Sequence, residues 1–281
     1  MFASTPAVID GIETGGTFAD RPRNAHHGAG YYASDLQRSL HYDSLLNLWV
    51  PDDGKLLLVT AENYYVDCFR GAALDNAYST GKGNDAQAAL GVLDTDQQGG
   101  ELDMVTGDAG TGTAADATSL APTIAFDITA ATKATRLGTR VKLSAITDVA
   151  AYIGLTDVLP ASVLELPISL SGTTFTTTAT DAGGLLFDTA ATTDTIRGIG
   201  VDDDNDTTQL DTALAYVADT YVDLLLLITP AGVASVYIDQ ALIGTFVVST
   251  NADLYPILFA EARSTASRTL SAKYFFCHQD G

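Results

Sequence analysis

The stretch VDDDNDTTQL, Val201–Leu210, comes nearest in this sequence to a metal-binding motif. Asp202, Asp204 and Asp206 alternate as the first ligands of a calcium loop do. The pattern then fails, because Thr207 stands where such a loop requires glycine and no bidentate glutamate follows. A solvated turn between two strands uses the same residue types. We therefore predict a turn with no metal, and keep calcium on these three aspartates as the weaker alternative.

Glycoside hydrolysis is the second chemistry to consider, and it needs two carboxyl groups flanking the sugar. The glutamates are widely separated in the sequence: Glu13, Glu62, Glu101, Glu165 and Glu261. A pair of aspartates is the alternative that this spacing leaves open. The sequence contains no nucleophile elbow, phosphate-binding loop or dinucleotide-binding fingerprint. We predict that the protein is not an enzyme, with no catalytic residue and no cofactor.

The segment Phe18–Asp43 concentrates Arg and His in a very acidic chain and is itself close to neutral, because its three Arg balance three Asp. It holds three of the four histidines and three of the 14 Lys and Arg, although the formal net charge is −21. In one interpretation these cations pair with the chain's own acidic surface, each pair worth about 0–1 kcal/mol. We favour the other, a docking segment that binds a partner through Arg–carboxylate pairs and added strands. Its candidate residues are Arg21, Arg23, His26, His27, Tyr31, Tyr32, Arg38 and Tyr42.

The overall charge and the cysteines limit the partners and the compartment. A sequence pI near 4.1 argues against nucleic acid, because its phosphates would be repelled. No run reaches the roughly 18 apolar residues of a membrane helix, so no membrane partner is expected. Two cysteines, Cys68 and Cys277, do not suggest a disulfide framework and favour folding in a reducing cytosol.

The sequence predicts that the secondary-structure elements that carry these candidate residues are β-strands. Residues 1–61 contain the pattern strand–turn–strand in YYAS, DLQR and SLHYD, which is too little to bury a core alone. Residues 62–281 contain short apolar runs between Gly, Asp, Thr and Ser clusters. That spacing is typical of an all-β sandwich or barrel. We therefore predict an N-terminal attachment arm with a short hairpin, followed by an antiparallel β-sandwich.

One predicted strand, Tyr221–Ile228, is apolar on both faces. Val222, Leu224, Leu226 and Ile228 share one face, and Leu225 and Leu227 share the other. A strand of this kind needs cover on its second side. Leu225 and Leu227 are therefore candidates for a contact with another subunit.

Several blocks occur in an order that resembles a structural domain of tailed-phage virion proteins. They are RVKLSAITDVAAYIGLTD, ELPISLSGTTFTTTATDAGGLLFDTAATTDTIRGIGVDDD, VASVYIDQALIGTF and ARSTASRTLSAKYFF. The resemblance covers about Asp67 to the end and implies a concanavalin-like, laminin-G-like jelly roll. Two departures are visible: Gln240 follows Asp239 where relatives close a hairpin with glycine, and Ile196–Arg197 replace an aromatic position.

The resemblance implies a non-enzymatic virion protein, most simply a capsid decoration (cement) protein on the outer shell, assembled in the host cytoplasm. The alternative is a tail-fibre or receptor-binding module for a host glycan, which the missing aromatic platform disfavours. The expected partner is the major capsid protein or another virion protein, and the expected oligomer is a homotrimer. The resemblance also places Cys68 and Cys277 in neighbouring first and last strands.

Overall fold

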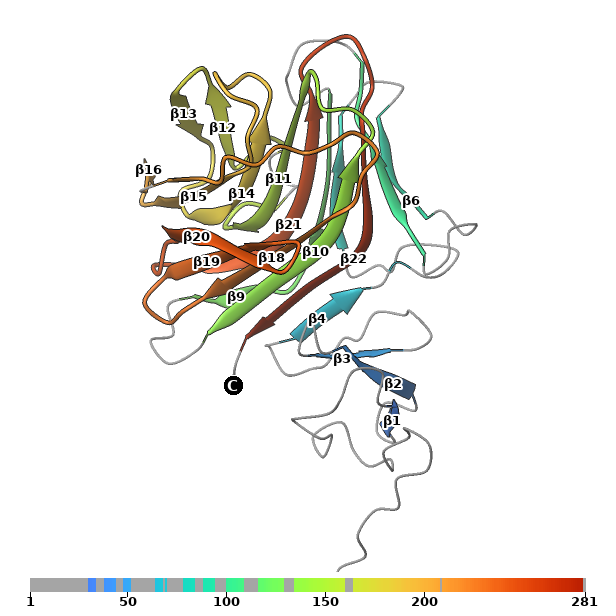
Figure 1. Cartoon of the computed structure of the whole chain (residues 1–281). Coiled ribbons are helices and arrows are strands. Elements are labelled where there is room, and N and C mark those ends of the chain that lie inside the picture. The colour runs from blue at the N-terminus through green and yellow to red at the C-terminus, as the bar shows by residue number, and fades with distance from the viewer. Residues whose placement is uncertain are drawn as a thin grey trace, which may run out of the picture.

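The structure is a computed structural model that describes residues 30–33, 38–43, 48–51, 64–67, 69, 78–83, 88–93, 100–108, 116–128, 134–159, 164–207 and 209–279. Apart from a 3₁₀ residue at Asp116, the regular secondary structure in these ranges consists of β-strands. Two large sheets face each other, which confirms the predicted all-β antiparallel sandwich (Figure 1). In the same ranges no helix has the length and hydropathy needed to cross a bilayer.

The first large sheet has eight strands in the order β20-β19-β18-β10-β22-β7-β6, with β4 also paired to β22. β22 therefore has β10 along one edge and β4 and β7 in succession along the other. The strands are β4 (Tyr64–Asp67), β6 (Ala89–Leu93), β7 (Leu102–Val105), β10 (Thr135–Leu143), β18 (Val222–Ile228), β19 (Val233–Ile238), β20 (Ala241–Val247) and β22 (Thr269–Gln279).

The second large sheet has nine strands in the order β16-β15-β14-β11-β21-β8-β5, with β17 paired to β15 and β9 to β21. The strands are β5 (Tyr78–Lys82), β8 (Ala117–Pro122), β9 (Phe126–Asp127), β11 (Val149–Thr156), β14 (Ala182–Asp188), β15 (Arg197–Asp202), β16 (Asn205–Asp206), β17 (Leu210–Asp211) and β21 (Asp253–Ala262).

Two small sheets complete the described part. β1 (Gly30–Ala33) pairs with β2 (Arg38–Asp43), which confirms the predicted N-terminal hairpin, and β3 (Leu48–Pro51) adds a third strand. β12 (Ile168–Ser171) and β13 (Thr174–Thr177) form a separate hairpin. The boundary between an arm and the sandwich near residue 61 stays a prediction.

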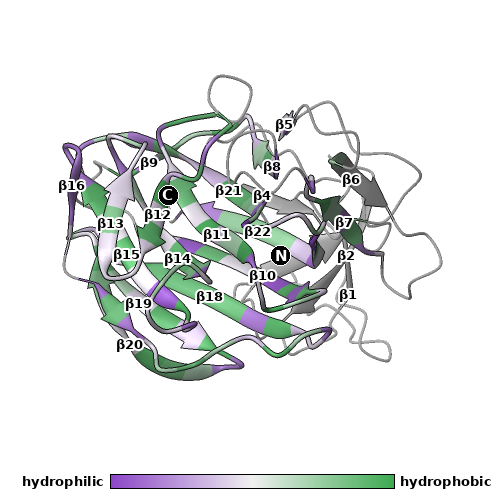
Figure 2. Ribbon diagram, turned by 90° about the horizontal axis from the view of Figure 1, so that it is seen from above, coloured by the Kyte–Doolittle hydropathy of each residue, from purple (hydrophilic) through white to green (hydrophobic). Residues whose placement is uncertain are grey.

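The main core lies between the two large sheets. Side chains alternate along β18, so that Leu224 and Leu226 are buried while Leu225 and Leu227 are only half-buried on the outer face. Ile153 of β11 faces the same core from the second sheet. The predicted split of β18 into two apolar faces is therefore confirmed, and Figure 2 shows apolar colouring along most of β18 and β20.

A second apolar cluster covers the outer face of the nine-stranded sheet. Strands β11 and β14 are buried along their whole length, on both faces. The hairpin β12–β13 contributes Ile168 and Leu170 to this cluster. The nine-stranded sheet is thus a central layer between the main core and the hairpin.

The predicted neighbourhood of the first and last strands is confirmed, because β4 pairs with β22 and places Tyr65 opposite Cys277. Cys277 is a buried, free thiol. Its burial raises the pKa of the thiol well above the ordinary value. Cys68 lies outside the described residues.

The hairpin between β19 and β20 closes with a two-residue turn. Ile238 pairs with Ala241, so Asp239 and Gln240 form the turn, with φ of 48° and 70°. Positive φ at both positions defines a type I′ turn, whose twist matches that of the flanking strands. The departure from glycine seen in the sequence therefore leaves the hairpin intact, with Gln240 held in a left-handed conformation.

Replacing Gln240 by glycine should stabilise the protein. Glycine adopts φ near 70° without a Cβ clash, so we expect Gln240→Gly to raise the free energy of unfolding by about 0.5–1 kcal/mol. Urea denaturation measures this. Ala241→Gly is the matched control, because residue 241 has no positive φ and glycine in a strand should destabilise. Equal effects of the two substitutions would contradict the turn assignment.

Candidate functional site

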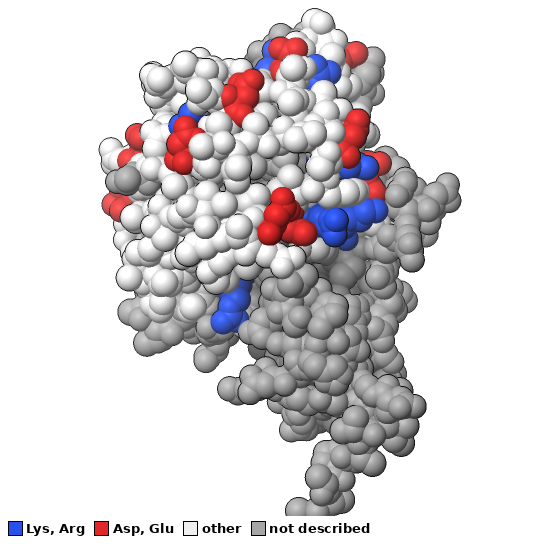
Figure 3. Space-filling model, viewed as in Figure 1, with Lys and Arg blue, Asp and Glu red and all other residues white. Residues whose placement is uncertain are grey.

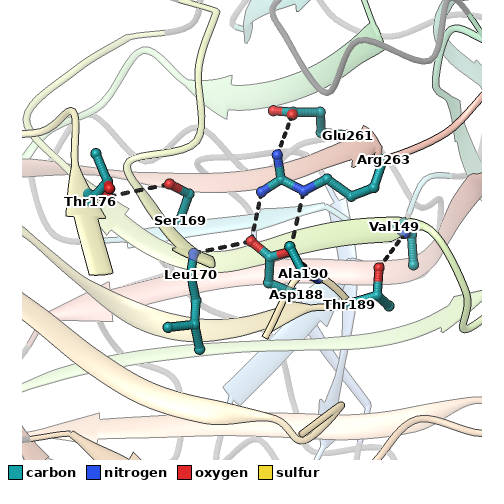
Figure 4. Close-up of polar contacts among 9 residues, drawn as sticks. All are labelled: Val149, Ser169, Leu170, Thr176, Asp188, Thr189, Ala190, Glu261 and Arg263. Carbon is teal, nitrogen blue, oxygen red and sulfur yellow. Dashed lines mark hydrogen bonds and ion pairs between the residues drawn. The ribbon is translucent and has the colours of Figure 1, made fainter. Parts of the chain in front are cut away.

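Two carboxyl groups meet on the outer face of the nine-stranded sheet. In the strand register Ala150 of β11 lies opposite Asp188 on β14 and opposite Glu261 on β21, so both carboxyl groups stand on one face with Ala150 between them. Arg263, just beyond β21, spans the gap and contacts both (Figure 4). This is the pair of acids nearest to hydrolase chemistry in the described part of the chain.

Asp188 accepts hydrogen bonds from two directions. The Arg263 guanidinium donates through Nη2 to Oδ2 at 2.6 Å and through Nε to Oδ1 at 3.2 Å. The backbone amides of Leu170 and Ala190 donate to the same carboxylate, at 3.1 and 3.0 Å. Because Leu170 belongs to β12, Asp188 ties the hairpin β12–β13 to the sheet below (Figure 4).

Glu261 is the less compensated of the two carboxyl groups. Its Oε1 accepts from Nη1 of Arg263 at 2.7 Å, and its side chain is 5% exposed. Burial raises the pKa of Glu261 to about 7, with additions from Asp188, Asp116 and Glu165, and Arg263 opposes this rise. Burial therefore outweighs the opposing effect of Arg263, because a carboxyl group removed from water is costly to ionise.

The described side chains around the two carboxyl groups are mostly buried. The side chain of Asp188 is completely buried and that of Arg263 is 17% exposed. The rest of the face is apolar and packed beneath the hairpin; the buried side chains there include Tyr152, Leu166, Ile168, Leu170, Leu186, Ile199, Ile257 and Phe259. Both carboxyl groups therefore bind Arg263, and Asp188 also binds the backbone of the hairpin β12–β13.

The aspartate-rich stretch forms a hairpin turn, as predicted. Asp202 pairs with Asn205, and the turn residues Asp203 and Asp204 have φ of 49° and 65°. The carboxylate of Asp202 accepts from Oγ of Ser249 at 3.1 Å and from Nδ2 of Asn251 at 2.6 Å. Asp204 and Asp206 are exposed.

The calcium alternative gains no support from this geometry. Among the described side chains, no three His, Cys, Asp or Glu residues lie where they could share a metal ion.

The outer face of the eight-stranded sheet carries a second polar network at one end. Glu101 is almost fully buried between two ammonium groups, Nζ of Lys142 at 2.8 Å and Nζ of Lys273 at 2.7 Å. Burial alone would raise the pKa of Glu101, but the hydrogen bonds from the lysines lower it to about 2. Both lysines and Arg140 also surround the ring of Tyr221. The network links residues in or next to β7, β10, β18 and β22.

Over β18–β20 the outward side chains are mostly apolar. Leu225 pairs with Tyr237 of β19, and Tyr237 with Leu242 of β20, so these three side chains form one row across three strands. Leu242 at the end of the row is 59% exposed. The predicted contact residues Leu225 and Leu227 therefore lie on a surface that extends to the edge of the sheet.

The candidate docking residues are described only in part. Arg21, Arg23, His26 and His27 lie outside the described residues. Tyr31, Tyr32, Arg38 and Tyr42 lie in β1 and β2, where the structure gives the backbone pairing. Docking through them stays a prediction.

Sequence reasoning missed the cluster of Asp188, Glu261 and Arg263. Asp188 and Arg263 are 75 residues apart, so no local spacing brings them together. One signal in the sequence could have indicated the cluster: Asp188 ends the continuous apolar run GGLLFD. A charged side chain at the end of a buried strand needs a partner of opposite charge.

Loss of the shared cation should destabilise the protein strongly. Arg263→Met leaves Asp188 and Glu261 buried without their cation, at a cost of about 3–5 kcal/mol of unfolding free energy. The matched control is Arg140→Met, because Arg140 is 49% exposed and lies 3.8 Å from Asp223. That control should cost less than about 1 kcal/mol. Chemical denaturation compares them, and similar costs would refute the assignment.

The stability of the protein should also depend on the ionisation of Glu261. Its pKa is higher in the folded chain than its ordinary value of 4.5, so the protonated form is the one that stabilises the fold. That contribution is complete below about pH 4.5 and is lost as the pH rises through about 7.

The variant Glu261→Gln cannot ionise at this position. Relative to it, we expect the wild type to lose a few kcal/mol of unfolding free energy over this pH range. Each unit of pKa shift corresponds to about 1.4 kcal/mol. Denaturation at a series of pH values gives the two profiles. Parallel profiles would show that Glu261 titrates normally.

Comparison with known proteins supports the fold. No protein-family model matches the chain, and no curated protein matches it. A β-glucanase of Bacillus licheniformis is similar over 77% of this chain and 98% of its own, with 9% identity and a TM-score of 0.53. A β-1,3-1,4-glucanase (lichenase) from a mouse hindgut metagenome is similar over 77% and 99%, with 11% identity and a TM-score of 0.52. At such identities the likeness concerns architecture alone, and the chain has the concanavalin-like jelly-roll sandwich fold of these glucanases.

Proposed function

We propose that this protein is a non-enzymatic structural protein of a tailed-phage virion, a decoration protein on the outer capsid. The observation that carries the non-enzymatic part is the closed outer face of the nine-stranded sheet. Asp188 and Glu261 are buried there, bound to Arg263 and covered by β12–β13. The jelly roll thus serves as a scaffold, and the virion assignment rests on the sequence blocks described above.

The charge distribution is consistent with an exposed place on a particle. A chain with net charge −21 repels DNA, so a surface facing solvent suits it better than one lining packaged DNA. The proposed partner is the major capsid protein or another virion protein, contacted through the N-terminal segment.

A second candidate is a tail-fibre or receptor-binding module that recognises a host glycan. Its support is the fold, which this chain shares with proteins named as β-glucanases. The buried outer face of the nine-stranded sheet disfavours a sugar groove there, so such a module would have to bind through loops.

Copy number and binding distinguish these functions. Purified chain, added to particles of the encoding phage that lack it, should bind in hundreds of copies if it decorates the capsid and in a handful if it belongs to the tail. Full-length Arg21→Glu/Arg23→Glu/Arg38→Glu should bind at least tenfold more weakly, because charge-assisted Arg–carboxylate pairs are lost.

The control is the wild-type chain at the same concentration, with circular dichroism to verify that the variant folds. Hydrolysis of lichenan by the purified chain would refute the non-enzymatic assignment. Absence from the particle would refute the virion role.

A further inference from the structure

The hairpin β12–β13 is a hydrogen-bonded unit of its own. Among the described strands, β12 and β13 pair only with each other. The backbone amides of Thr178 and Ala179 both donate to the carbonyl oxygen of Pro167, at 3.0 and 3.2 Å, and close the hairpin at its base. These bonds do not involve the large sheets, so they are retained if the hairpin moves away from the nine-stranded sheet.

The loop that follows β14 holds the hairpin in place (Figure 1). The amide of Leu170 donates to the carboxylate of Asp188 at 3.1 Å. The amide of Gly172 donates to the carbonyl oxygen of Ala190 at 2.7 Å, and the amide of Thr192 donates to that of Gly172 at 2.8 Å. One longer bond of 3.5 Å joins β13 to the turn between β15 and β16. The bond to Asp188 is the one in this loop that depends on a charged side chain.

The hairpin also helps to cover Glu261. In the register Glu261 lies between Ala150 of β11 and Ala117 of β8. Both alanines belong to the buried cluster to which Ile168 and Leu170 of the hairpin contribute. Figure 3 shows several separate groups of charged residues that reach the surface on one face, whereas Glu261 is only 4% exposed. The carboxyl group of Glu261 is therefore largely removed from water while the hairpin is in place.

Four charged groups act on Glu261, each from a different element. They are Arg263 just after β21, Asp188 at the end of β14, Asp116 just before β8 and Glu165 shortly before β12. Burial raises the pKa of Glu261 to about 7, the three acids add to this rise, and Arg263 opposes it. An ionised Glu261 is therefore costly beneath the hairpin, and less costly where water reaches it.

We infer that the hairpin β12–β13 is a flap that opens, without unfolding of the sandwich, when Glu261 ionises. In the closed state the protonated Glu261 accepts from Arg263, and Asp188 balances the charge of the arginine. In the open state Glu261 is hydrated and has its ordinary pKa of 4.5, so the open state gains population as the pH rises through about 7. Opening exposes apolar side chains that the closed hairpin buries, Ile168 and Leu170 among them.

Amide hydrogen exchange of the full-length protein tests whether the flap exists. Rates corrected for the intrinsic effect of pH give a protection factor for the amide of Leu170, and the amide of Ile153 in β11 reports unfolding of the sandwich. Local opening exposes little surface, so Leu170 should be less protected than Ile153. Low urea should reduce the protection of Ile153 and hardly change that of Leu170.

The pH dependence tests whether Glu261 controls the flap. The protection of Leu170 in the wild type should fall about 30-fold from about pH 5.5 to about pH 8.5, given the two pKa values of Glu261 in the closed and open states. Glu261→Gln should keep this protection nearly constant. Glu165→Gln is the matched control, because it makes the same change at an exposed carboxyl group near the hairpin, and it should retain the fall.

Two results would overturn the inference. Equal protection and equal urea dependence of Leu170 and Ile153 would show that the hairpin opens only when the sandwich unfolds. A fall with pH that is the same in the wild type and in Glu261→Gln would show that another group controls opening. Circular dichroism verifies that both variants fold, and the urea series on the wild type decides the first point without any variant. These measurements need no particle, so the flap and the virion role are tested separately.

Discussion

A single arginine holds the outer layer of this protein in place. Arg263 neutralises Asp188 through two hydrogen bonds and contacts Glu261 with its remaining nitrogen, all on a face with little access to water. Asp188 in turn accepts from the backbone of β12, so the hairpin β12–β13 is fixed by the same charge that the arginine stabilises. Without the cation, burying these carboxyl groups would cost more than the hairpin's apolar contacts return.

The two outer faces of the sandwich consequently differ in kind. The nine-stranded sheet is closed by a hairpin and an apolar layer, and its strands β11 and β14 are buried on both sides. Over β18–β20 of the eight-stranded sheet, the described residues include no such layer, and the outward apolar residues are exposed or half-buried. One sheet has its second face covered within the chain, and part of the other sheet's outer face carries exposed apolar side chains.

This asymmetry bears on function. The similar solved structures are glucanases, yet their likeness to this chain lies in architecture, and the acids that the fold brings together here are bound to Arg263. The outward positions of β18–β20 are largely uncharged, although the chain has a net charge of −21.

Local chemistry in the sequence was enough to predict the sandwich, the alternation of β18, the N-terminal hairpin and the turn at Asp203–Asp204, because strand periodicity and turn residues act over a few positions. The turn type at Asp239–Gln240 was not predictable, since Gln240 has little preference of its own for positive φ and the pairing of β19 with β20 imposes it. The cluster of Asp188, Glu261 and Arg263 depended entirely on tertiary structure. Its members come from separate strand ends, and only the register of β14, β11 and β21 places them on one face. The sequence by itself determined which strands exist and which faces are apolar, whereas the packing of one sheet on another decided which charges are buried, because burial depends on neighbours that are remote in the chain.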